Sequence, residues 1–113
     1  MSNIRRRCCC YTRCFEKNID YKGMEEIINK YPTIIVDVRS EQEFKEGHIN
    51  GAINIPLYKV KSDFQKKIKN KNEYIVLYCT SGIRSKKAQN ILISMGYTNV
   101  YSLYGGLESL QNI

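Results

Sequence analysis

Hydrophobic and polar positions follow regular periods along most of this chain, from about residue 19 onward. Runs rich in β-branched and aromatic residues predict strands over 33–38, 52–55, 74–78 and 99–103. Apolar residues at helical spacing predict helices over about 21–31, 40–46, 57–68 and 85–95. Because the strands alternate with helices, we expect an α/β fold with a parallel sheet and helices on both faces.

Several helix ends carry their own signals. Ser40 and Glu43 have the spacing of a capping box, and Ser85 can cap the helix that follows it. Pro32 ends the first helix, and Gly96 has the position of a glycine just past a helix end. These signals support the element boundaries that the periodicity predicts.

The chain has 113 residues, enough for one domain with a single core and too few for two. Residues 1–17 lack periodicity, so we predict a flexible, basic, cysteine-rich tail there and one domain over 18–113. No apolar run approaches the roughly 18 residues of a membrane span. No apolar stretch follows the N-terminal arginines, as a secretory signal would require. We therefore expect a cytoplasmic protein without a membrane span.

The net charge of +7 raises the question of nucleic-acid binding. Residues 1–18 carry five basic side chains and one acidic one, which leaves thirteen against ten for the rest of the chain. The domain is therefore only mildly basic, and no stacking aromatics interleave a basic stripe. We expect no nucleic-acid partner, and the mild positive charge suits a small anionic substrate.

The five cysteines form two groups, four in the tail at Cys8, Cys9, Cys10 and Cys14, and Cys79 alone. The tail cysteines have several open interpretations. They can bind zinc or copper, although three adjacent cysteines are not the usual ligand spacing. They can also resolve a disulfide, accept sulfur from Cys79, carry an acyl group or have no role at all. We predict no metal site in the domain.

The loop Cys79-Thr-Ser-Gly-Ile-Arg84 directly follows a predicted buried strand and precedes a predicted helix. Ligands of open α/β sheets bind beyond the carboxyl ends of the strands, where backbone N–H groups and the positive helix end favour anions. Such a place favours the thiolate form of a cysteine. We predict Cys79 as a nucleophile, with Arg84 as a fixed positive charge and Gly82 permitting tight curvature. The alternative is that Cys79 is a small buried hydrophobic residue.

Three side chains around this loop, Thr80, Ser81 and Ser85, offer hydroxyl groups to an oxyanion. No carboxylate stands beside the loop in the sequence, so we expect none there to serve as an acid for a leaving group. The loop as a whole, including Ile83 through its amide, is the predicted substrate-binding site.

Four motifs in this order resemble the rhodanese homology domain: Asp37-Val-Arg39, Gly47-His-Ile-Asn-Gly-Ala52, the Cys79–Arg84 loop and Gly105-Gly106-Leu107. The resemblance covers about residues 19–112. It implies a five-stranded parallel sheet with helices on both faces. It also implies that Cys79 accepts sulfane sulfur as a persulfide, cradled by the amides of Thr80 through Arg84.

In that chemistry the thiolate takes sulfur from thiosulfate or a similar anionic donor, and a second nucleophile removes it. The acceptor is cyanide, a small thiol or a protein thiol, and a protein can also be the donor. No cofactor is needed. The expected activity is that of a thiosulfate sulfurtransferase.

Two alternatives remain. A cysteine-dependent phosphatase or arsenate reductase uses the same kind of nucleophile, but such phosphatases place arginine one residue further from the cysteine than Arg84 stands from Cys79. The shorter loop favours sulfur over phosphate. A non-enzymatic rhodanese-like module that carries sulfur or binds a partner is the second alternative.

Other polar and aromatic residues receive lesser roles. His48, the only histidine, can pair with a cysteine, but its place in a turn favours a structural role. Asp37 and Arg39 end a buried strand and are predicted as supporting residues beside the loop. Tyr78 and Tyr104 are expected near the mouth of the site.

Overall fold

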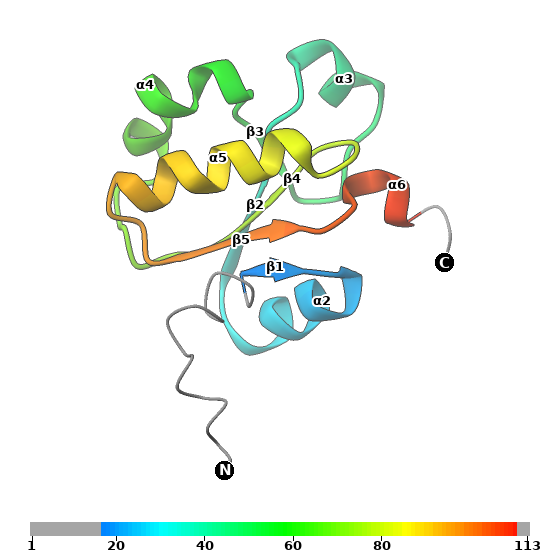
Figure 1. Ribbon diagram of the computed structural model, residues 1–113, viewed down its shortest axis with the longest axis horizontal. Coiled ribbons are helices and arrows are strands. Elements are labelled where there is room, and N and C mark those ends of the chain that lie inside the picture. Colours follow the sequence, from blue (N-terminus) through cyan, green and yellow to red (C-terminus); the bar gives the residue numbers. More distant parts are fainter. Residues whose placement is uncertain (1–16, 111–113) are drawn as a thin grey trace.

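The computed structural model describes residues 17–110, which form an α/β fold (Figure 1). The strands are β1 (Asn18–Ile19), β2 (Thr33–Asp37), β3 (Ile53–Asn54), β4 (Tyr74–Tyr78) and β5 (Asn99–Leu103). The helices are α2 (Tyr21–Lys30), α3 (Glu41–Glu46), α4 (Leu57–Lys67), α5 (Ile83–Ser94) and α6 (Gly106–Leu110). The alternation of strands and helices confirms the predicted fold class.

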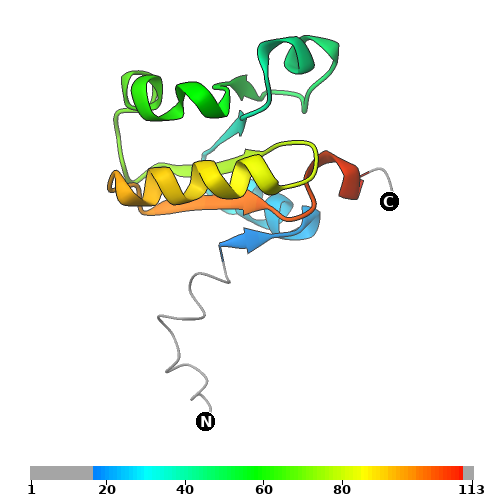
Figure 2. The ribbon, with the colours of Figure 1, turned by 45° about the horizontal axis from the view of Figure 1, so that its top comes forward.

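All five strands are parallel, in the order β1-β5-β4-β2-β3. Strand β4 is the middle strand, and β2 and β5 pair with it on either side. Helices α4 and α5 cover one face of the sheet, and α2 packs on the other (Figures 1 and 2). The carboxyl end of β4 therefore lies at the centre of the sheet edge where ligands of such folds bind.

The side chains of β4 alternate between two apolar clusters. Ile75 and Leu77 join the cluster under α4 and α5, and Cys79 continues that series. Val76 and Tyr78 join the opposite cluster, which contains Met24 of α2. Because successive side chains of a strand point to opposite faces, the strand period directs Cys79 toward α5.

The structure differs from the predicted elements at three places. Strand β1 was not predicted, because it has only two residues, which pair with Ser102 and Leu103 of β5. Strand β3 is shorter than the predicted 52–55. Helix α5 begins at Ile83, so the prediction that Ser85 caps it is wrong.

Two predicted helix ends are confirmed. The hydroxyl of Ser40 accepts a hydrogen bond from the Glu43 amide at 3.2 Å, and the Glu43 carboxylate accepts one from the Ser40 amide at 3.1 Å. This is the complete capping box of α3. Gly96 follows α5 with a φ of 100°, the left-handed conformation that ends many helices.

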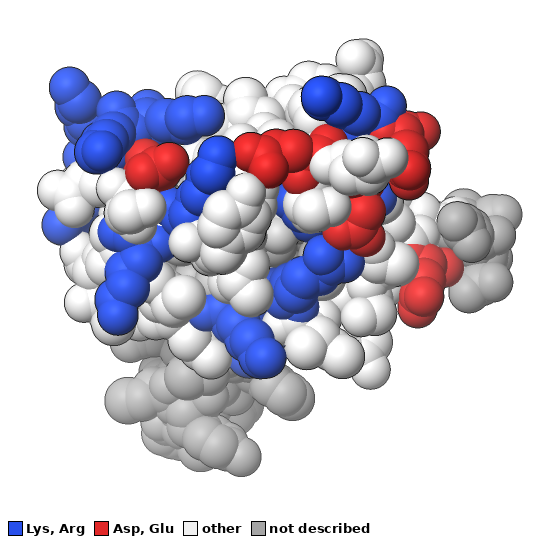
Figure 3. Space-filling view, turned by 90° about the horizontal axis from the view of Figure 1, so that it is seen from above, with Lys and Arg blue, Asp and Glu red and all other residues white. Residues whose placement is uncertain are grey.

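The face above α3 and α4 carries both signs of charge (Figure 3). Lysines gather over α4 and acidic side chains over α3, and Lys59 pairs with Glu41 across the two helices at 2.8 Å. Among the helices of residues 17–110, none is long and apolar enough to cross a membrane. The predicted tail and its four cysteines lie outside the described residues, so the predicted boundary between tail and domain stays a prediction.

Candidate active site

Cys79 lies where β4 ends, at the bottom of the short loop that leads into α5. Its side chain is buried, with 1% of its surface exposed. The Gly82 amide donates a hydrogen bond to Sγ at 3.1 Å, and the Ser85 amide donates another at 3.4 Å. The thiol donates to the Ser85 hydroxyl at 3.8 Å. The loop thus bends around the sulfur and directs N–H groups at it, an arrangement that stabilises negative charge.

Of the two amides that donate to the sulfur, Gly82 lies within the predicted cradle of residues 80–84 and Ser85 lies just beyond it. The cradle of a persulfide by all the amides of Thr80 through Arg84 stays a prediction. Gly82 has a φ of 101° and is the residue that caps α5. A Cβ at this position would also lie 3.1 Å from the Gly105 amide nitrogen. Both the left-handed backbone and the close approach of the neighbouring loop require glycine.

Ser85 does not offer its hydroxyl to an external oxyanion, which corrects the prediction. The side chain is wholly buried, and its hydroxyl donates to the Gly82 carbonyl at 3.1 Å. The Ser102 hydroxyl of β5 lies 2.8 Å away. The physical reason is that α5 begins two residues earlier than predicted, which turns Ser85 inward. Its hydroxyl instead accepts a hydrogen bond from the Cys79 thiol.

The other predicted hydroxyl residues differ in exposure. Thr80 is half-buried, and Ser81 is exposed at the tip of the loop. Ile83 is 65% exposed, a large apolar side chain left open to solvent beside the site. The tip of the loop thus presents one polar and one apolar side chain.

The N-terminal end of α6 fixes the backbone of the loop. The Leu107 amide donates to the Cys79 carbonyl at 2.9 Å, and the Glu108 amide donates to the Thr80 carbonyl at 2.9 Å. Gly106 approaches so closely that a Cβ there would lie 2.4 Å from the Cys79 carbonyl oxygen. The sequence signal of this support is the pair of glycines at 105–106, which belong to a motif of the rhodanese resemblance, but the sequence does not predict their contact with the loop.

Arg84 forms an ion pair that the sequence did not predict. Its two terminal nitrogens donate to the two oxygens of Glu43 at 2.8 and 3.1 Å. Arg84 lowers the pKa of Glu43 to about 2, with help from the Ser40 amide. The expectation that no carboxylate stands beside the loop is therefore wrong, because the capping box of α3 brings Glu43 there from 41 residues away.

This ion pair also changes the predicted role of Arg84. Glu43 compensates part of its positive charge and raises the pKa of Arg84. Arg84 is still close enough to Cys79 for a favourable Coulombic interaction between them. Its charge is thus partly compensated rather than free.

Asp37 and Arg39 form a second, buried ion pair at 2.8 Å. The Arg39 guanidinium also donates to the Gly47 carbonyl at 2.6 Å, so the pair fastens the turn after α3 to the end of β2. Hydrogen bonding to Asp37 raises the pKa of Arg39. These contacts fit the predicted supporting role near the loop and give the pair no direct contact with the sulfur.

The remaining candidate residues, one histidine and two tyrosines, lie in three different environments. His48 stacks on the Phe44 ring and its Nδ1 lies 2.8 Å from the Phe44 carbonyl oxygen, contacts that match a structural role. Tyr78 is wholly buried on the opposite face of the sheet, so its predicted place at the mouth of the site is wrong. The strand period explains this, because Tyr78 directly precedes Cys79. Tyr104 is 73% exposed.

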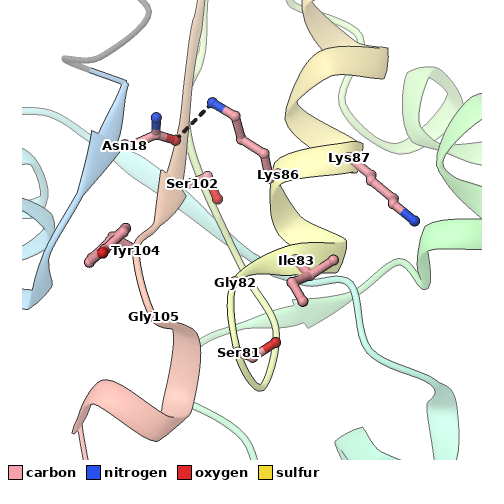
Figure 4. Close-up of a pocket in the computed structure, with 9 residues that line it drawn as sticks. All are labelled: Asn18, Ser81, Gly82, Ile83, Lys86, Lys87, Ser102, Tyr104 and Gly105. Atoms are coloured by element: carbon pink, nitrogen blue, oxygen red, sulfur yellow. Dashed lines mark hydrogen bonds between the residues drawn. The ribbon is translucent and has the colours of Figure 1, made fainter.

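A cavity of about 610 Å³ opens beside the loop (Figure 4). It lies between the loop, the first turns of α5 and the edge formed by β5 and β1, and its residues are Asn18, Ser81, Gly82, Ile83, Lys86, Lys87, Ser102, Tyr104 and Gly105. The cavity is lined by two lysines and no carboxylate. Within residues 17–110, no group of three or more His, Cys, Asp or Glu side chains could hold a metal ion.

The arrangement of the loop, the amide cradle and the parallel sheet agrees with the family model that this chain matches. A family model described as a rhodanese-like domain matches residues 20–113. The chain belongs to the rhodanese family. Within this rhodanese domain the resemblance seen in the motifs is confirmed.

Curated rhodanese relatives include two thiosulfate sulfurtransferases. PspE of Escherichia coli K12 is 40% identical over 75 residues, which cover 66% of this chain and 71% of PspE. GlpE of Coxiella burnetii is 32% identical over 93 residues, which cover 82% of this chain and 85% of GlpE. The tRNA uridine(34) hydroxylase of Buchnera aphidicola (subsp. Baizongia pistaciae) is 35% identical over 92 residues, 76% of this chain and only 29% of that protein.

A solved structure with the rhodanese fold, a rhodanese with anions from E. coli, is 39% identical in sequence. It superimposes with a TM-score of 0.63 over 68% of this chain and 89% of its own.

Proposed function

We propose that this rhodanese domain is a sulfurtransferase, in which Cys79 takes a sulfane sulfur from thiosulfate or a similar anionic donor and passes it to a thiol or cyanide. The observation that carries the proposal is the pair of amides, from Gly82 and Ser85, that donate to a buried Cys79 sulfur. The identity to two thiosulfate sulfurtransferases supports the same chemistry.

In the first half-reaction the Cys79 thiolate attacks the outer sulfur of thiosulfate. The S–S bond of the donor breaks, and sulfite leaves with its electron pair. The product is a persulfide, Cys79–S–S⁻, whose charge replaces that of the thiolate. The Gly82 and Ser85 amides already point at the sulfur, so they need not reorganise as the negative charge moves to the outer sulfur. This preorganisation stabilises the charge of the persulfide.

In the second half-reaction a nucleophile attacks the outer sulfur of the persulfide. The S–S bond of the persulfide breaks, and the Cys79 thiolate is restored. The two half-reactions share a covalent intermediate, so the kinetics are expected to be ping-pong. The cavity beside the loop, with Lys86 and Lys87 in its wall, offers space from which an anionic donor or acceptor can approach.

Phosphoryl or arsenate chemistry is the weaker alternative. The carboxylate beside the loop, Glu43, has a pKa of about 2 and is bound to Arg84, so it holds no proton to give to a leaving group near neutral pH. The loop is also one residue shorter between cysteine and arginine than in cysteine-dependent phosphatases.

The carrier alternative differs from the enzyme only in whether a partner protein, rather than thiosulfate, loads Cys79.

The test is an intact-mass measurement after incubation with thiosulfate under conditions that exclude other oxidants. The natural chain is expected to gain one sulfur atom, and Cys79→Ser is expected to gain none. Production of thiocyanate from thiosulfate and cyanide measures turnover in the same samples. Sulfur uptake that persists in Cys79→Ser, or turnover of an aryl phosphate without thiocyanate formation, would overturn the proposal.

A matched control distinguishes loss of the nucleophile from loss of the fold. Ser94→Ala changes a hydroxyl at the far end of α5, where it only donates to the Ile91 carbonyl. This variant is expected to load sulfur as the natural chain does. If Cys79 takes up sulfur from a donor protein but not from thiosulfate, the carrier alternative is correct.

A further inference from the structure

Glu43 and Arg84 meet where α3 lies beside the start of α5, at the end of the active-site loop (Figure 1). Both terminal nitrogens of Arg84 donate to the Glu43 carboxylate, at 2.8 and 3.1 Å. The side chains of Arg84 and Glu43 are 37% and 33% exposed. An anion that approaches the loop from this side therefore meets a positive and a negative charge together.

The Glu43 carboxylate is held in place by α3 as well as by Arg84. The Ser40 amide and the Ser40 hydroxyl both donate to its Oε1 atom at 3.1 Å, as part of the capping box. Hydrogen bonds from Arg84 and Ser40 lower the pKa of Glu43 to about 2, so the carboxylate is charged at neutral pH. The negative charge beside the loop is therefore permanent and fixed in position.

The charges on the α3 side of the loop cancel in pairs. Asp37 and Arg39 form one ion pair at 2.8 Å, and Glu43 and Arg84 form the other. Asp37 also raises the pKa of Arg84, and Glu43 raises that of Arg39, so the two pairs lie within Coulombic reach of each other. These four side chains together have no net charge.

The cavity side of the loop has uncompensated positive charge. Lys86 and Lys87 line the cavity, and neither forms an ion pair with a residue of the described range 17–110. Lys86 donates instead to the neutral side chain of Asn18 at 3.1 Å. An anionic donor is thus attracted by these lysines, whereas the charge that Arg84 offers it is compensated. Because a Coulombic energy is proportional to the charge of the ligand, this compensation weakens the attraction of a doubly charged donor most.

We propose that Glu43 determines the charge selectivity of sulfur uptake, by weakening the attraction of doubly charged donors more than that of singly charged ones. The inference rests on the proposed function, because it concerns the donor that loads Cys79. Glu43 forms no hydrogen bond with the Cys79 sulfur, whose partners are Gly82 and Ser85. It is therefore a positioning residue, which acts through Arg84 and through its own charge.

Thiosulfate and methanethiosulfonate are a matched pair of donors for this question. Thiosulfate carries two negative charges at neutral pH, and methanethiosulfonate carries one. With either donor the Cys79 thiolate attacks the outer sulfur, and the S–S bond of the donor breaks. The leaving group takes the electron pair, as sulfite from thiosulfate and as methanesulfinate from methanethiosulfonate. Both donors leave the same persulfide on Cys79, so their comparison reports the effect of donor charge.

The experiment measures kcat/KM for each donor, with cyanide as the acceptor, in the natural chain and in Glu43→Gln. In ping-pong kinetics this constant reports the first half-reaction alone. Glutamine also completes capping boxes, so the variant is expected to keep the start of α3. We expect kcat/KM to rise about three- to tenfold for thiosulfate, and by only about the square root of that factor for methanethiosulfonate. Added salt is expected to reduce both increases.

Glu41→Gln is the matched control, because it removes the same charge from the same helix. Glu41 pairs with Lys59 at 2.8 Å rather than with Arg84. This variant is expected to leave the ratio of the two kcat/KM values unchanged. The ratio does not depend on the amount of active protein, because both donors are measured on one sample. A variant that is partly unfolded therefore still tests the inference.

The ratio also separates the possible failures. An unchanged ratio in Glu43→Gln, including a fall of both kcat/KM values by the same factor, overturns the inference and leaves the proposed function intact. A ratio that moves in favour of methanethiosulfonate overturns it as well. So does an equal change in Glu41→Gln, because the selectivity then comes from the general surface charge. If neither donor loads Cys79 in the natural chain, the proposed function fails and the inference fails with it.

Discussion

Glu43 on α3 holds the guanidinium of Arg84, in the first turn of α5, through two hydrogen bonds of 2.8 and 3.1 Å. The same carboxylate closes the capping box of α3 by accepting from the Ser40 amide. One side chain therefore fixes the start of α3 and positions the arginine of the active-site loop. This contact connects two segments that the sequence alone gave no reason to pair.

Replacing Glu43 by glutamine tests whether this pair steadies the loop. Glutamine keeps an acceptor for the Ser40 amide but removes the charge that binds Arg84. We expect a loss of stability of about 0.5–1 kcal/mol, because both side chains are partly exposed, and a several-fold change in sulfur uptake from thiosulfate. Glu41→Gln breaks the exposed pair with Lys59 and is expected to leave sulfur uptake unchanged. Equal kinetics in both variants would show that the Arg84 pair has no influence on the loop.

The same pair predicts a dependence of stability on acid. The folded pKa of Glu43 is about 2, below its ordinary value, so the folded state favours the charged form. This contribution is fully present above the ordinary pKa of a glutamate and is lost as the pH falls toward 2. Chemical denaturation at a series of pH values is expected to show a shallower acid loss for Glu43→Gln than for the natural chain. Parallel curves for the two proteins would contradict the assignment.

Gly106 tests the support of the loop by α6. An alanine there would bring its Cβ to 2.4 Å from the Cys79 carbonyl oxygen, and its φ of 58° adds backbone strain. We expect Gly106→Ala to displace the loop and lower thiosulfate turnover by more than about tenfold, with a loss of stability of roughly 1–3 kcal/mol. Gly51→Ala is the matched control, because it has a φ of 86° and nothing within 4 Å. It is expected to lose stability only modestly and to keep its turnover.

The sequence predicted the framework better than the details of the site. Long runs such as Tyr74–Tyr78 identify buried strands because they are apolar on both faces, and the Cys79 loop followed from the next element boundary. Strand β1 was missed because two residues carry no period. The Glu43–Arg84 pair was missed because contacts over 41 residues depend on how helices pack, which periodicity does not encode.

Ser85 and Tyr78 show a subtler limit of sequence reading. Ser85 was assigned to a helix end from its residue type, but Gly82 takes that role through its backbone conformation. Tyr78 was placed near the site because it adjoins Cys79, although neighbouring side chains of a strand face opposite sides. In both cases the residue type alone does not determine the direction in which the side chain points.

Tyr78 gives a prediction for alkaline pH. Burial raises the pKa of Tyr78 to about 12, above the ordinary value of 10. Between these values the unfolded chain loses the proton before the folded one does, so stability is complete below pH 10 and falls as the pH rises toward 12. Tyr78→Phe is expected to reduce that alkaline loss, as measured by denaturation at pH values in this range.

The same substitution has a cost at neutral pH. The Ile49 amide donates to the Tyr78 hydroxyl at 3.0 Å, and phenylalanine leaves that amide without this acceptor. We expect Tyr78→Phe to lose about 1–2 kcal/mol at pH 7. Tyr104→Phe removes a hydroxyl from a ring that is 73% exposed and is expected to lose less than about 0.5 kcal/mol. Equal losses in the two variants would argue against the buried hydrogen bond.

Ser85 supplies the last prediction, because its hydroxyl and amide both contact the sulfur. Ser85→Ala removes the hydroxyl and keeps the amide, so the cradle loses one of its three contacts with Cys79. In the structure the Ser85 hydroxyl accepts from the thiol and donates to the Gly82 carbonyl, so stabilising the thiolate requires this hydroxyl to turn and donate to the sulfur. A hydrogen bond to a charged group contributes roughly 1.5–3 kcal/mol, so we expect alkylation of Cys79 by iodoacetamide to slow at least about fivefold when that bond is lost. Ser102→Ala removes the neighbour of Ser85 but leaves the Ser85 hydroxyl at the sulfur, and it is expected to slow alkylation less. If both variants react as fast as the natural chain, the hydroxyl does not stabilise the thiolate and the two amides alone form the cradle.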